Sequence, residues 1–386
     1  SEIMRTWKQA AALTLSVLLT VSAAFPALAV EKPADMDDAT WARLQDNTLE
    51  YDEIENLVLY YNPTYRQVVD TIEVQLDPLK TAVADLKDYV QEQRDDARRA
   101  KDDGDMMSYK IGMATASAIE KQAVKGLETG LRTAQGATKT TKDQIRRTMT
   151  SAIEGLVITY HQTLASKELV DTSVALAQAA YDSAIAQQGI GMATEADVQS
   201  ALKSLTSAQN GQKSLNDGLT TLKRNICVMT GWDYNADMEI AAVPAPELAS
   251  IDTMNPDEDT RKAISYHPTI ISLRGTNGHG DVNRGIKERS LEDTENKINT
   301  KVHDLYTAVL QSKITCDGAA SAYESARLTM EGNERKYAMG MLGNLQYLQL
   351  KMVYLQQKQA YDSAVLSLKQ AINDYNWALY GVVTLD

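Results

Sequence analysis

The residues that could do chemistry are few and scattered in this 386-residue chain. The four histidines are His161, His267, His279 and His303, with no pair four positions apart and no cysteine beside them. Metal sites on helices need ligands one turn apart, so this scatter does not favour one. The spacing suggests no serine–histidine–aspartate set and no paired buried carboxylates. We therefore expect no enzyme activity, no catalytic residue, no metal site and no cofactor.

Gly189-x-Gly191 has the spacing of part of a phosphate-binding loop, but predicted helix rather than strand precedes it, which argues against a nucleotide site. The net charge of −13 and the lack of a basic stripe argue against a nucleic-acid partner. The residues after Gly191 instead predict a helix start. Thr194 is a good N-cap, and Glu195 and Asp197 lie in the first turn, where the helix dipole favours anions.

The N-terminal residues have the pattern of a secretory signal peptide. Met4 is the expected start, Arg5 and Lys8 are positive, residues 10–24 are apolar, and 27–29 (Ala-Leu-Ala) form a small-x-small cleavage site. The apolar part is too short to span a bilayer comfortably, although an uncleaved anchor is the alternative. We expect a chain exported by a Sec-type signal that acts in the cell envelope or outer membrane.

Composition predicts the fold class. The chain is rich in alanine and leucine and has a single phenylalanine, Phe25, which lies in the predicted signal. This bias favours long helices with alanine-filled seams over a bulky globular core, so we expect an all-α fold.

Two stretches of the chain are alike at a constant offset. Gly191-Met192 aligns with Gly340-Met341, and 340 − 191 = 149 positions separate them. The same offset pairs Leu219 with Leu368. Each stretch predicts a long helix, a tight glycine turn and a returning helix, which indicates a duplicated helical hairpin.

A second pair of landmarks, Tyr61-Asn62-Pro63 and Tyr266-His267-Pro268, opens the two copies. The first proline lies 191 − 63 = 128 positions before its glycine turn and the second only 340 − 268 = 72, so the ascending helix of the second copy is expected to be a stub. The predicted organisation is a signal peptide at 4–29, an N-terminal arm at 30–60, helical repeat 1 at 61–232, a Pro-rich acidic linker at 233–262 and a shortened repeat 2 at 263–386.

In repeat 1, Asn62 can cap a helix that begins at Pro63 and ends near Gly104. From about Ser108 to Gln188 the apolar period predicts one very long helix, with a break possible near Gly136. The returning helix then runs to about Met229 and ends at Gly231. The arm before Pro63 is expected to be partly ordered at most, and the linker to be loop and extended chain.

In repeat 2, a helix is expected from Ile286 to Lys336, with a heptad seam that includes Val302 and Val309. Asn344 is expected to cap the last helix. That helix has two apolar seams, one through Leu355 and one through Ala364, which predicts neighbouring helices on two sides.

The two cysteines are expected to stay apart. Export makes a disulfide between Cys227 and Cys316 worth weighing. Cys316 lies 340 − 316 = 24 residues before one turn, and Cys227 lies 227 − 191 = 36 residues after the other. In side-by-side hairpins their heights differ by 12 residues, roughly 18 Å, whereas bridged Cα atoms lie within about 7 Å. We predict two buried free thiols.

The duplicated order of Asn-Pro or His-Pro, long helix, glycine turn and returning helix resembles the TolC-type outer-membrane efflux channels. Residues 191–199 are similar to that family's first tip turn, Gly-x-x-x-x-x-Asp-Val. At the second tip Tyr337-x-x-Gly340 is present, but Gln346 stands at the position that matches Asp197. The resemblance covers about residues 57–381 and rests on the whole arrangement rather than on one specific motif.

The resemblance implies a homotrimer whose helices form a hollow tube, working with a membrane-fusion adaptor protein and an inner-membrane pump of the ABC or RND type. It also implies strands of an outer-membrane β-barrel beyond each ascending helix. Residues 99–120 and 272–288 contain no such strand pair, since 109–118 is better explained as helix. We therefore expect an all-α, TolC-like helical tube from which the barrel strands are absent.

The resemblance further implies that the tips narrow the tube and contact the adaptor. In one interpretation Thr194, Glu195 and Asp197 from three chains ring the aperture and select cations; in the other they are ordinary helix caps. Gln346 cannot extend an acidic ring to the second tip. The candidate tip residues are Gly191, Thr194, Glu195, Asp197, Tyr337, Gly340, Asn344 and Gln346.

Two functions remain open from the sequence. The first is an exported channel or conduit of a tripartite efflux or secretion system, which the duplication and the two-seamed helix favour. The second is an exported structural coiled-coil or interaction protein that has lost the pore, which the missing strands and the shortened repeat 2 favour. A neighbouring gene for an adaptor and a pump would support the first.

Overall fold

The computed structural model describes residues 30–276 and 280–385. Within these ranges the chain is almost entirely helical, and the only strands are β1 (Thr48–Leu49) and β2 (Glu239–Ile240), which pair in parallel. The predicted all-α fold class is therefore confirmed. The predicted signal peptide lies outside the described residues.

The first ascending helix begins and ends where the sequence predicts. Asn62 caps α4 (Pro63–Asp102), because its side-chain oxygen accepts a hydrogen bond of 2.8 Å from the backbone N–H of Tyr65. Gly104, with φ of 85°, then turns the chain into α5 (Met106–Ile119). Residues 109–118 are helix, as expected.

The single long helix expected over 108–188 is wrong. It is divided into α5, the π-helical turn η2 (Glu120–Val124), α6 (Lys125–Ala165) and α7 (Lys167–Gly189). The break falls at Ser166, whose N–H bonds Thr163 three residues back, which tightens the turn. Gly136 causes no break: it lies exposed inside α6, where a glycine costs only about 1 kcal/mol.

The remaining long helices follow the predicted pattern. They are α8 (Glu195–Thr230), the stub α11 (Pro268–Gly275), α12 (Asp281–Ala338) and α13 (Asn344–Leu379). α8 and α13 start 344 − 195 = 149 positions apart and end 379 − 230 = 149 positions apart. Val302 and Val309 are buried in α12, which confirms the predicted seam.

The N-terminal arm is ordered, which corrects the expectation. It forms α2 (Asp38–Leu44), the short 3₁₀ turn η1 (Tyr51–Glu53) and α3 (Ile54–Tyr61). Leu49, Leu57 and Val58 are fully buried against α6 and α8. Burial of that much apolar surface outweighs the entropy cost of ordering the segment, although no long periodic pattern marks it in the sequence.

The linker is also more structured than expected. It contains β2, which pairs with β1 of the arm, and the helices α9 (Leu248–Ile251) and α10 (Pro256–Tyr266). Pro256 starts α10 instead of breaking the chain: it occupies the first turn, and Asn255 caps it. A proline with a capping residue before it predicts a helix start, whereas the expectation of a loop treated Pro256 only as a helix breaker.

Each repeat is closed by the same joint, in which a left-handed glycine packs on the Tyr-x-Pro segment. Gly231, with φ of 88°, lies against Tyr61, and Gly381, with φ of 84°, lies against the backbone of Tyr266. In the first joint Asn62 Nδ2 donates to the carbonyl of Met229 at 2.8 Å. Both glycines are close enough that a Cβ would collide with the tyrosine segment.

His267 takes the place of Asn62 in the second joint. It is 4% exposed, its Nδ1 caps α11 by accepting from the N–H of Thr269 at 3.3 Å, and it also bonds the backbone of Val383. Burial lowers the pKa of His267, and the Val383 bond offsets this only partly. The neutral imidazole is therefore the form that the joint holds.

Acid is expected to weaken this joint. The folded-state pKa of His267 is below its unfolded value, so the unfolding free energy should fall as the pH drops through the unfolded pKa of about 6.5. His267→Asn should reduce that fall, measured by urea unfolding at pH 7.5 and pH 5.5. His303→Asn is the control of opposite sign, because hydrogen bonds to Asn299 and Asp257 raise the pKa of His303. An unchanged pH dependence in His267→Asn would contradict this role.

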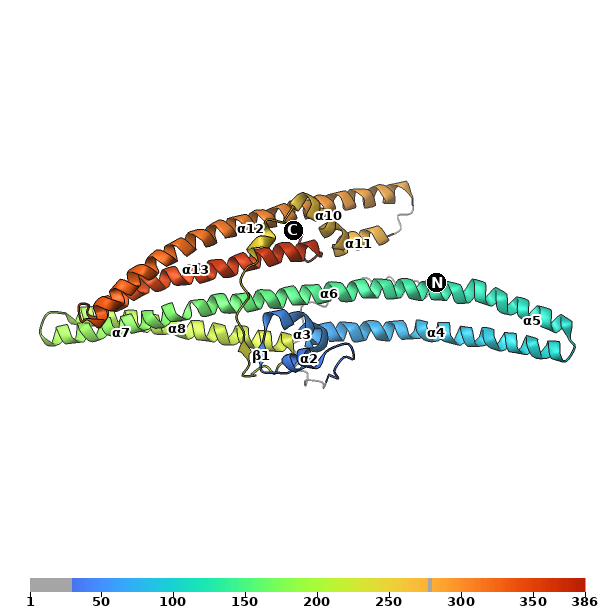
Figure 1. The fold of residues 1–386 in the computed structure, drawn as a ribbon, viewed down its shortest axis with the longest axis horizontal. Coiled ribbons are helices and arrows are strands. Elements are labelled where there is room, and N and C mark those ends of the chain that lie inside the picture. Colours follow the sequence, from blue (N-terminus) through green and yellow to red (C-terminus); the bar gives the residue numbers. More distant parts are fainter. Residues whose placement is uncertain (1–29, 277–279, 386) are drawn as a thin grey trace.

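The long helices form a row (Figure 1). α4 pairs with α6 toward one end of the molecule, and α7 pairs with α8 toward the other. α13 packs along α6 and α7 on one side and along α12 on the other, so the row in the half with the glycine turns is α8, α7, α13, α12. No helix in the described part of the chain is long and apolar enough to cross a membrane.

Candidate functional site at the hairpin tips

The first tip joins α7 to α8 through a tight turn. Gly191 has φ of 75°, its N–H bonds Gln188 at 2.9 Å, and the N–H of Met192 bonds Gln187 at 2.8 Å. These two bonds satisfy carbonyls that the end of α7 would otherwise leave free. Glycine is needed because the left-handed region is costly for a residue with a Cβ.

Thr194 and Asp197 form a capping box at the start of α8. The N–H of Asp197 bonds Thr194 Oγ1 at 3.2 Å, and Asp197 Oδ2 accepts from the N–H and the hydroxyl of Thr194 at 2.8 and 2.7 Å. The backbone bond and then the hydroxyl bond lower the pKa of Asp197. Thr194 and Asp197 therefore cap α8, as their spacing predicts. Glu195 forms no hydrogen bond or ion pair among the described residues, so its carboxylate is available to bind a partner or an ion.

The second tip repeats the turn with different side chains. Gly340 has φ of 72°, its N–H bonds Tyr337 at 2.9 Å, and the N–H of Met341 bonds Lys336 at 2.8 Å. Tyr337 stacks on Tyr347 with ring centroids 4.1 Å apart. An aromatic pair thus braces this tip, where the first has a capping box. Gln346 is exposed and neutral in place of Asp197.

The predicted cap by Asn344 is wrong. Gly343 is the N-cap of α13, and it supplies no side-chain bond. Asn344 is already the first helical residue, one position too late for its side chain to reach back to the N–H groups of the first turn. Its Oδ1 lies 3.5 Å from the hydroxyl of Tyr337, a weak contact at most.

A capping difference between the tips gives a direct prediction. Thr194→Ala should cost about 1 kcal/mol, because it removes the acceptor for the N–H of Asp197. Asn344→Ala, one position after the equivalent N-cap of the second tip, should change the unfolding free energy by no more than about 0.5 kcal/mol. Hydrogen exchange in the first turns of α8 and α13 measures both. Equal protection losses in the two variants would contradict the assigned caps.

Both tips expose large apolar side chains, which the candidate set from the sequence missed. Ile190 is 71% exposed, Met192 76%, Met339 66% and Met341 66%. Apolar side chains exposed in a turn are unfavourable in water. These residues therefore form an apolar surface suited to contact with a partner. The signal was present in the sequence, since methionine follows the glycine at both turns, but the alignment used it only to find the repeat.

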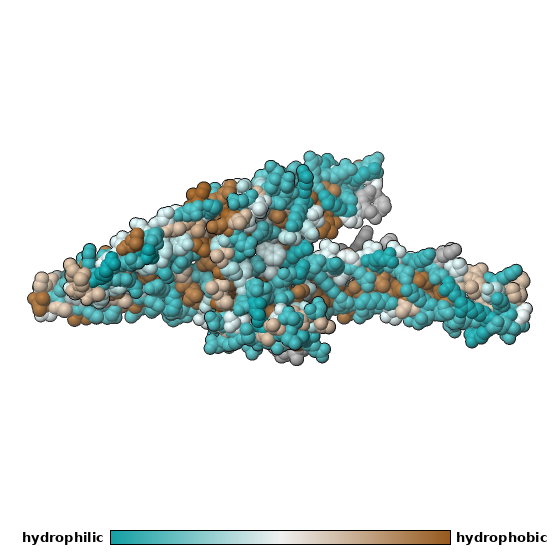
Figure 2. All heavy atoms as spheres, viewed as in Figure 1, coloured by the Kyte–Doolittle hydropathy of each residue, from teal (hydrophilic) through white to brown (hydrophobic). Residues whose placement is uncertain are grey.

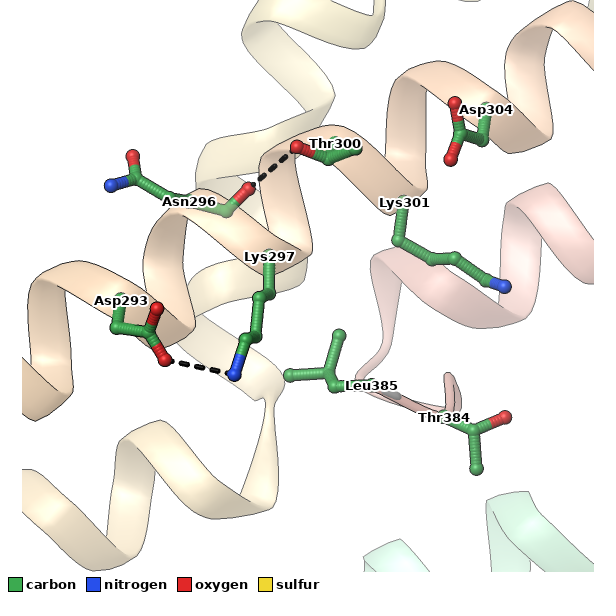
Figure 3. Close-up of a pocket in the computed structure, with 8 residues that line it drawn as sticks. All are labelled: Asp293, Asn296, Lys297, Thr300, Lys301, Asp304, Thr384 and Leu385. Atoms are coloured by element: carbon green, nitrogen blue, oxygen red, sulfur yellow. Dashed lines mark hydrogen bonds and ion pairs between the residues drawn. The ribbon is translucent and has the colours of Figure 1, made fainter.

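Away from the tips, the described chain offers little for chemistry. A shallow pocket beside α12 is polar, and Lys297 there is paired with Asp293 at 2.9 Å (Figure 3). No set of three or more metal-binding side chains meets among the described residues. The residues that line the pocket are Asp293, Asn296, Lys297, Thr300, Lys301, Asp304, Thr384 and Leu385.

The cysteines are both free, as predicted. Cys227 is buried, and burial raises the pKa of its thiol. Cys316 is only half-buried, which corrects the expectation of two buried thiols. It lies at the margin of the α12 seam, where the side chain reaches partly into solvent.

A scan against protein-family models gives no match for this chain, and no curated protein sequence matches it. Solved structures do match. A membrane protein from Pseudomonas aeruginosa aligns with a TM-score of 0.52 at 13% identity, over 92% of this chain and 99% of that one. The CmeC outer membrane channel of Campylobacter jejuni aligns with a TM-score of 0.45 at 12% identity, over 66% of this chain and 68% of that one. The VceC outer membrane protein of Vibrio cholerae gives 0.43 at 13% identity, over 66% and 76%.

The match to the Pseudomonas aeruginosa protein extends over nearly the whole of both chains and shows a shared fold. Identity this low transfers no activity, so what the chain does is a separate question.

Proposed function

We propose that this chain is an exported TolC-like conduit component, which forms the wall of a passage for substrates across the cell envelope. The observation that carries the proposal is that α13 has helical neighbours on both sides, α12 on one and α6 and α7 on the other. Helices packed side by side in a row make a wall, whereas a solid rod would surround each helix. The similarity in fold to the Pseudomonas aeruginosa membrane protein, over nearly the whole of both chains, supports this proposal.

The proposal assigns the end with the tips to partner contact. Exposed Met192 and Met341, with Ile190 and Met339 beside them, would bind the hairpins of a membrane-fusion adaptor, and an inner-membrane pump of the ABC or RND type would supply energy. Glu195 is the carboxylate available for an aperture ring in a homotrimer. Export by the signal at 4–29, and the division into an arm, two repeats and a linker, belong to the same proposal.

The second candidate is an exported structural coiled-coil protein. The observation that favours it is the difference between the repeats: α4 has 40 residues, whereas α11 has 8. Beyond the start of α12, repeat 1 therefore projects as a two-helix hairpin with no counterpart from repeat 2. Such a hairpin could serve as a spacer or a docking arm.

Efflux in the source cell distinguishes the two. Deleting the gene should raise the accumulation of a fluorescent efflux dye several-fold, and the intact chain should restore export. A chain with Met192 and Met341 both changed to serine should restore export poorly if the tips bind an adaptor. Normal dye export after deletion, together with altered cell-envelope spacing, would contradict the conduit and support the structural protein.

A further inference from the structure

A cluster of polar side chains lies where three segments meet: the N-terminal arm, α6 of repeat 1 and α13 of repeat 2. We call it the Glu154 cluster. Its members are Tyr51 on η1, Glu154 on α6, and Asn373 and Trp377 on α13. All of their contacts lie within one chain, so what the cluster does is independent of whether several copies form a conduit.

Glu154 is the acceptor at the centre of the cluster. Trp377 Nε1 donates to Glu154 Oε2 at 2.6 Å, and Asn373 Nδ2 lies 3.5 Å from the same oxygen. Asn373 Nδ2 also donates to the hydroxyl of Tyr51, which joins the arm to the same network. The Glu154 carboxylate therefore connects α6 to α13 directly and to the arm through Asn373.

The carboxylate of Glu154 is held by neutral donors and has no salt bridge among the described residues. Lys369 of α13 is the cation that acts on it, but the Lys369 ammonium lies over the ring of Tyr51, 5.4 Å from the ring centroid. Glu55 of α3 acts with the opposite sign, although it is paired with Arg146. A partly buried carboxylate without an ion pair favours its neutral form.

The direction of the pKa shift agrees with this geometry. Burial raises the pKa of Glu154, and the Trp377 bond and the charge of Lys369 offset the rise only partly. The folded chain therefore binds a proton here more tightly than the unfolded chain does. The stabilisation that this proton gives is complete below the ordinary pKa of 4.5, and it is lost as the pH rises through the folded-state pKa.

Two more titratable groups face the cluster. Burial and the nearby charge of Glu154 raise the pKa of Tyr51, so its hydroxyl stays protonated. Burial also raises the pKa of Asp374 on α13, and a bond from Gln370 and the charge of Lys301 on α12 oppose that rise. Asp374 can add to an effect of acid, so a test has to separate it from Glu154.

The corresponding place in repeat 2 also favours a protonated side chain, through different chemistry. The offset of 149 carries Glu154 to His303 (154 + 149). His303 Nδ1 bonds the carbonyl of Asn299 at 2.9 Å and its Nε2 bonds Asp257 of α10 at 3.0 Å, and these bonds raise the pKa of His303. α10 packs on α12 as α3 packs on α6, so each repeat has a proton-binding residue at the same junction.

Solvent can reach the Glu154 cluster. Glu154, Asn373 and Trp377 are each only half-buried. On the face that Figure 2 shows, the surface around the arm and α6 is mostly hydrophilic. A proton can therefore exchange without global unfolding. An ionised Glu154 gains from hydration, which favours separation of the packed segments, whereas the neutral acid gains much less.

We propose that Glu154 is a proton-operated latch: with a proton bound it tightens the contact of α13 and the arm on α6, and without the proton that contact loosens. In acid the two repeats and the arm are held together as one unit. Because Asn373 connects Glu154 to Tyr51, the loosening at higher pH reaches the arm as well as α13.

Hydrogen exchange of the full chain between pH 5 and pH 8 tests the latch, with protection factors corrected for the pH dependence of intrinsic exchange. In the unchanged chain, protection of residues 49–58 and 369–379 should fall several-fold as the pH rises. Glu154→Gln has the size and the neutrality of the protonated acid, so its protection should stay at the acid level. Glu128→Gln is the matched control on the same helix, since Glu128 forms a surface ion pair with Lys87, and it should behave as the unchanged chain does.

Trp377→Phe gives a second measurement, the pH at which protection falls. The indole bond stabilises the ionised carboxylate, so its loss should move that pH upward even in a less stable variant. Asp374→Asn should keep the fall in protection. Three results would overturn the latch: a fall in Glu154→Gln equal to that of the unchanged chain, a pH that Trp377→Phe leaves unmoved, or a fall that Asp374→Asn abolishes.

Discussion

Changing Gly381 to alanine should destabilise the fold by roughly 3–5 kcal/mol, because the added methyl group would collide with fixed backbone atoms. An alanine Cβ would lie 2.3 Å from the carbonyl oxygen of Tyr266 and 2.7 Å from its carbonyl carbon. These are backbone atoms and cannot turn aside. The φ of 84° adds roughly 1–2 kcal/mol of backbone strain.

The matched control is Gly340→Ala. Gly340 has a similar φ of 72°, but nothing lies within 4 Å of an added Cβ. Only the backbone strain remains, roughly 1–2 kcal/mol. Urea unfolding of the two variants separates the effect of the collision from that of the backbone strain. Equal losses of unfolding free energy in the two variants would show that the joint at Gly381 is not tightly packed.

Truncating Tyr375 to alanine should cost about 3–5 kcal/mol. Its side chain is 1% exposed in the core between α10, α12 and α13, where its ring lies 6.2 Å from that of Tyr306. The hydroxyl also donates to Asp259 on α10. Removing the ring leaves a cavity and takes one hydrogen bond from the Asp259 carboxylate, which still accepts from the N–H of Asn255 at 3.1 Å.

Tyr375→Phe separates these two effects, because it keeps the ring and removes only the hydroxyl. It should cost about 1–3 kcal/mol, the range for a lost bond to a charged group. Thermal unfolding of both variants provides the measurement. A phenylalanine variant as unstable as the alanine variant would mean that the hydrogen bond, and not the packing, holds this core.

The long helices could be predicted because their limits depend on local chemistry. Asn62 before Pro63, Thr194 after a glycine turn and Gly231 at a helix end each act within a few residues, so the sequence alone identifies them. The 149-position offset located both tips for the same reason, since the two turns have the same hydrogen bonds.

The arm and the linker could not be predicted, because their order depends on distant partners. Leu49 and Leu57 are buried only once α6 and α8 have come together, and β1 forms only against β2, some 190 positions along the chain. Short apolar segments of this kind look the same in a loop and in a core. α13 contacts both α6 and α7, the helices on either side of the break at Ser166.

At the tips, sequence reasoning identified the caps of repeat 1 and misplaced one in repeat 2. Thr194 and Asp197 are paired as their spacing predicts. Asn344 lies one residue inside its helix, a difference too fine for a residue pattern to resolve. The exposed methionines were missed because an apolar residue in a turn is informative only when its exposure is known.

Electron microscopy of the purified chain from Val30 onward, with and without detergent, tests the central claim most directly. A conduit wall built from this row of helices predicts hollow particles of several copies, with helices running along the walls and the tips of α7–α8 and α12–α13 at one end. Thin solid rods that remain monomeric at every concentration would contradict the conduit and leave the exported structural protein as the better account.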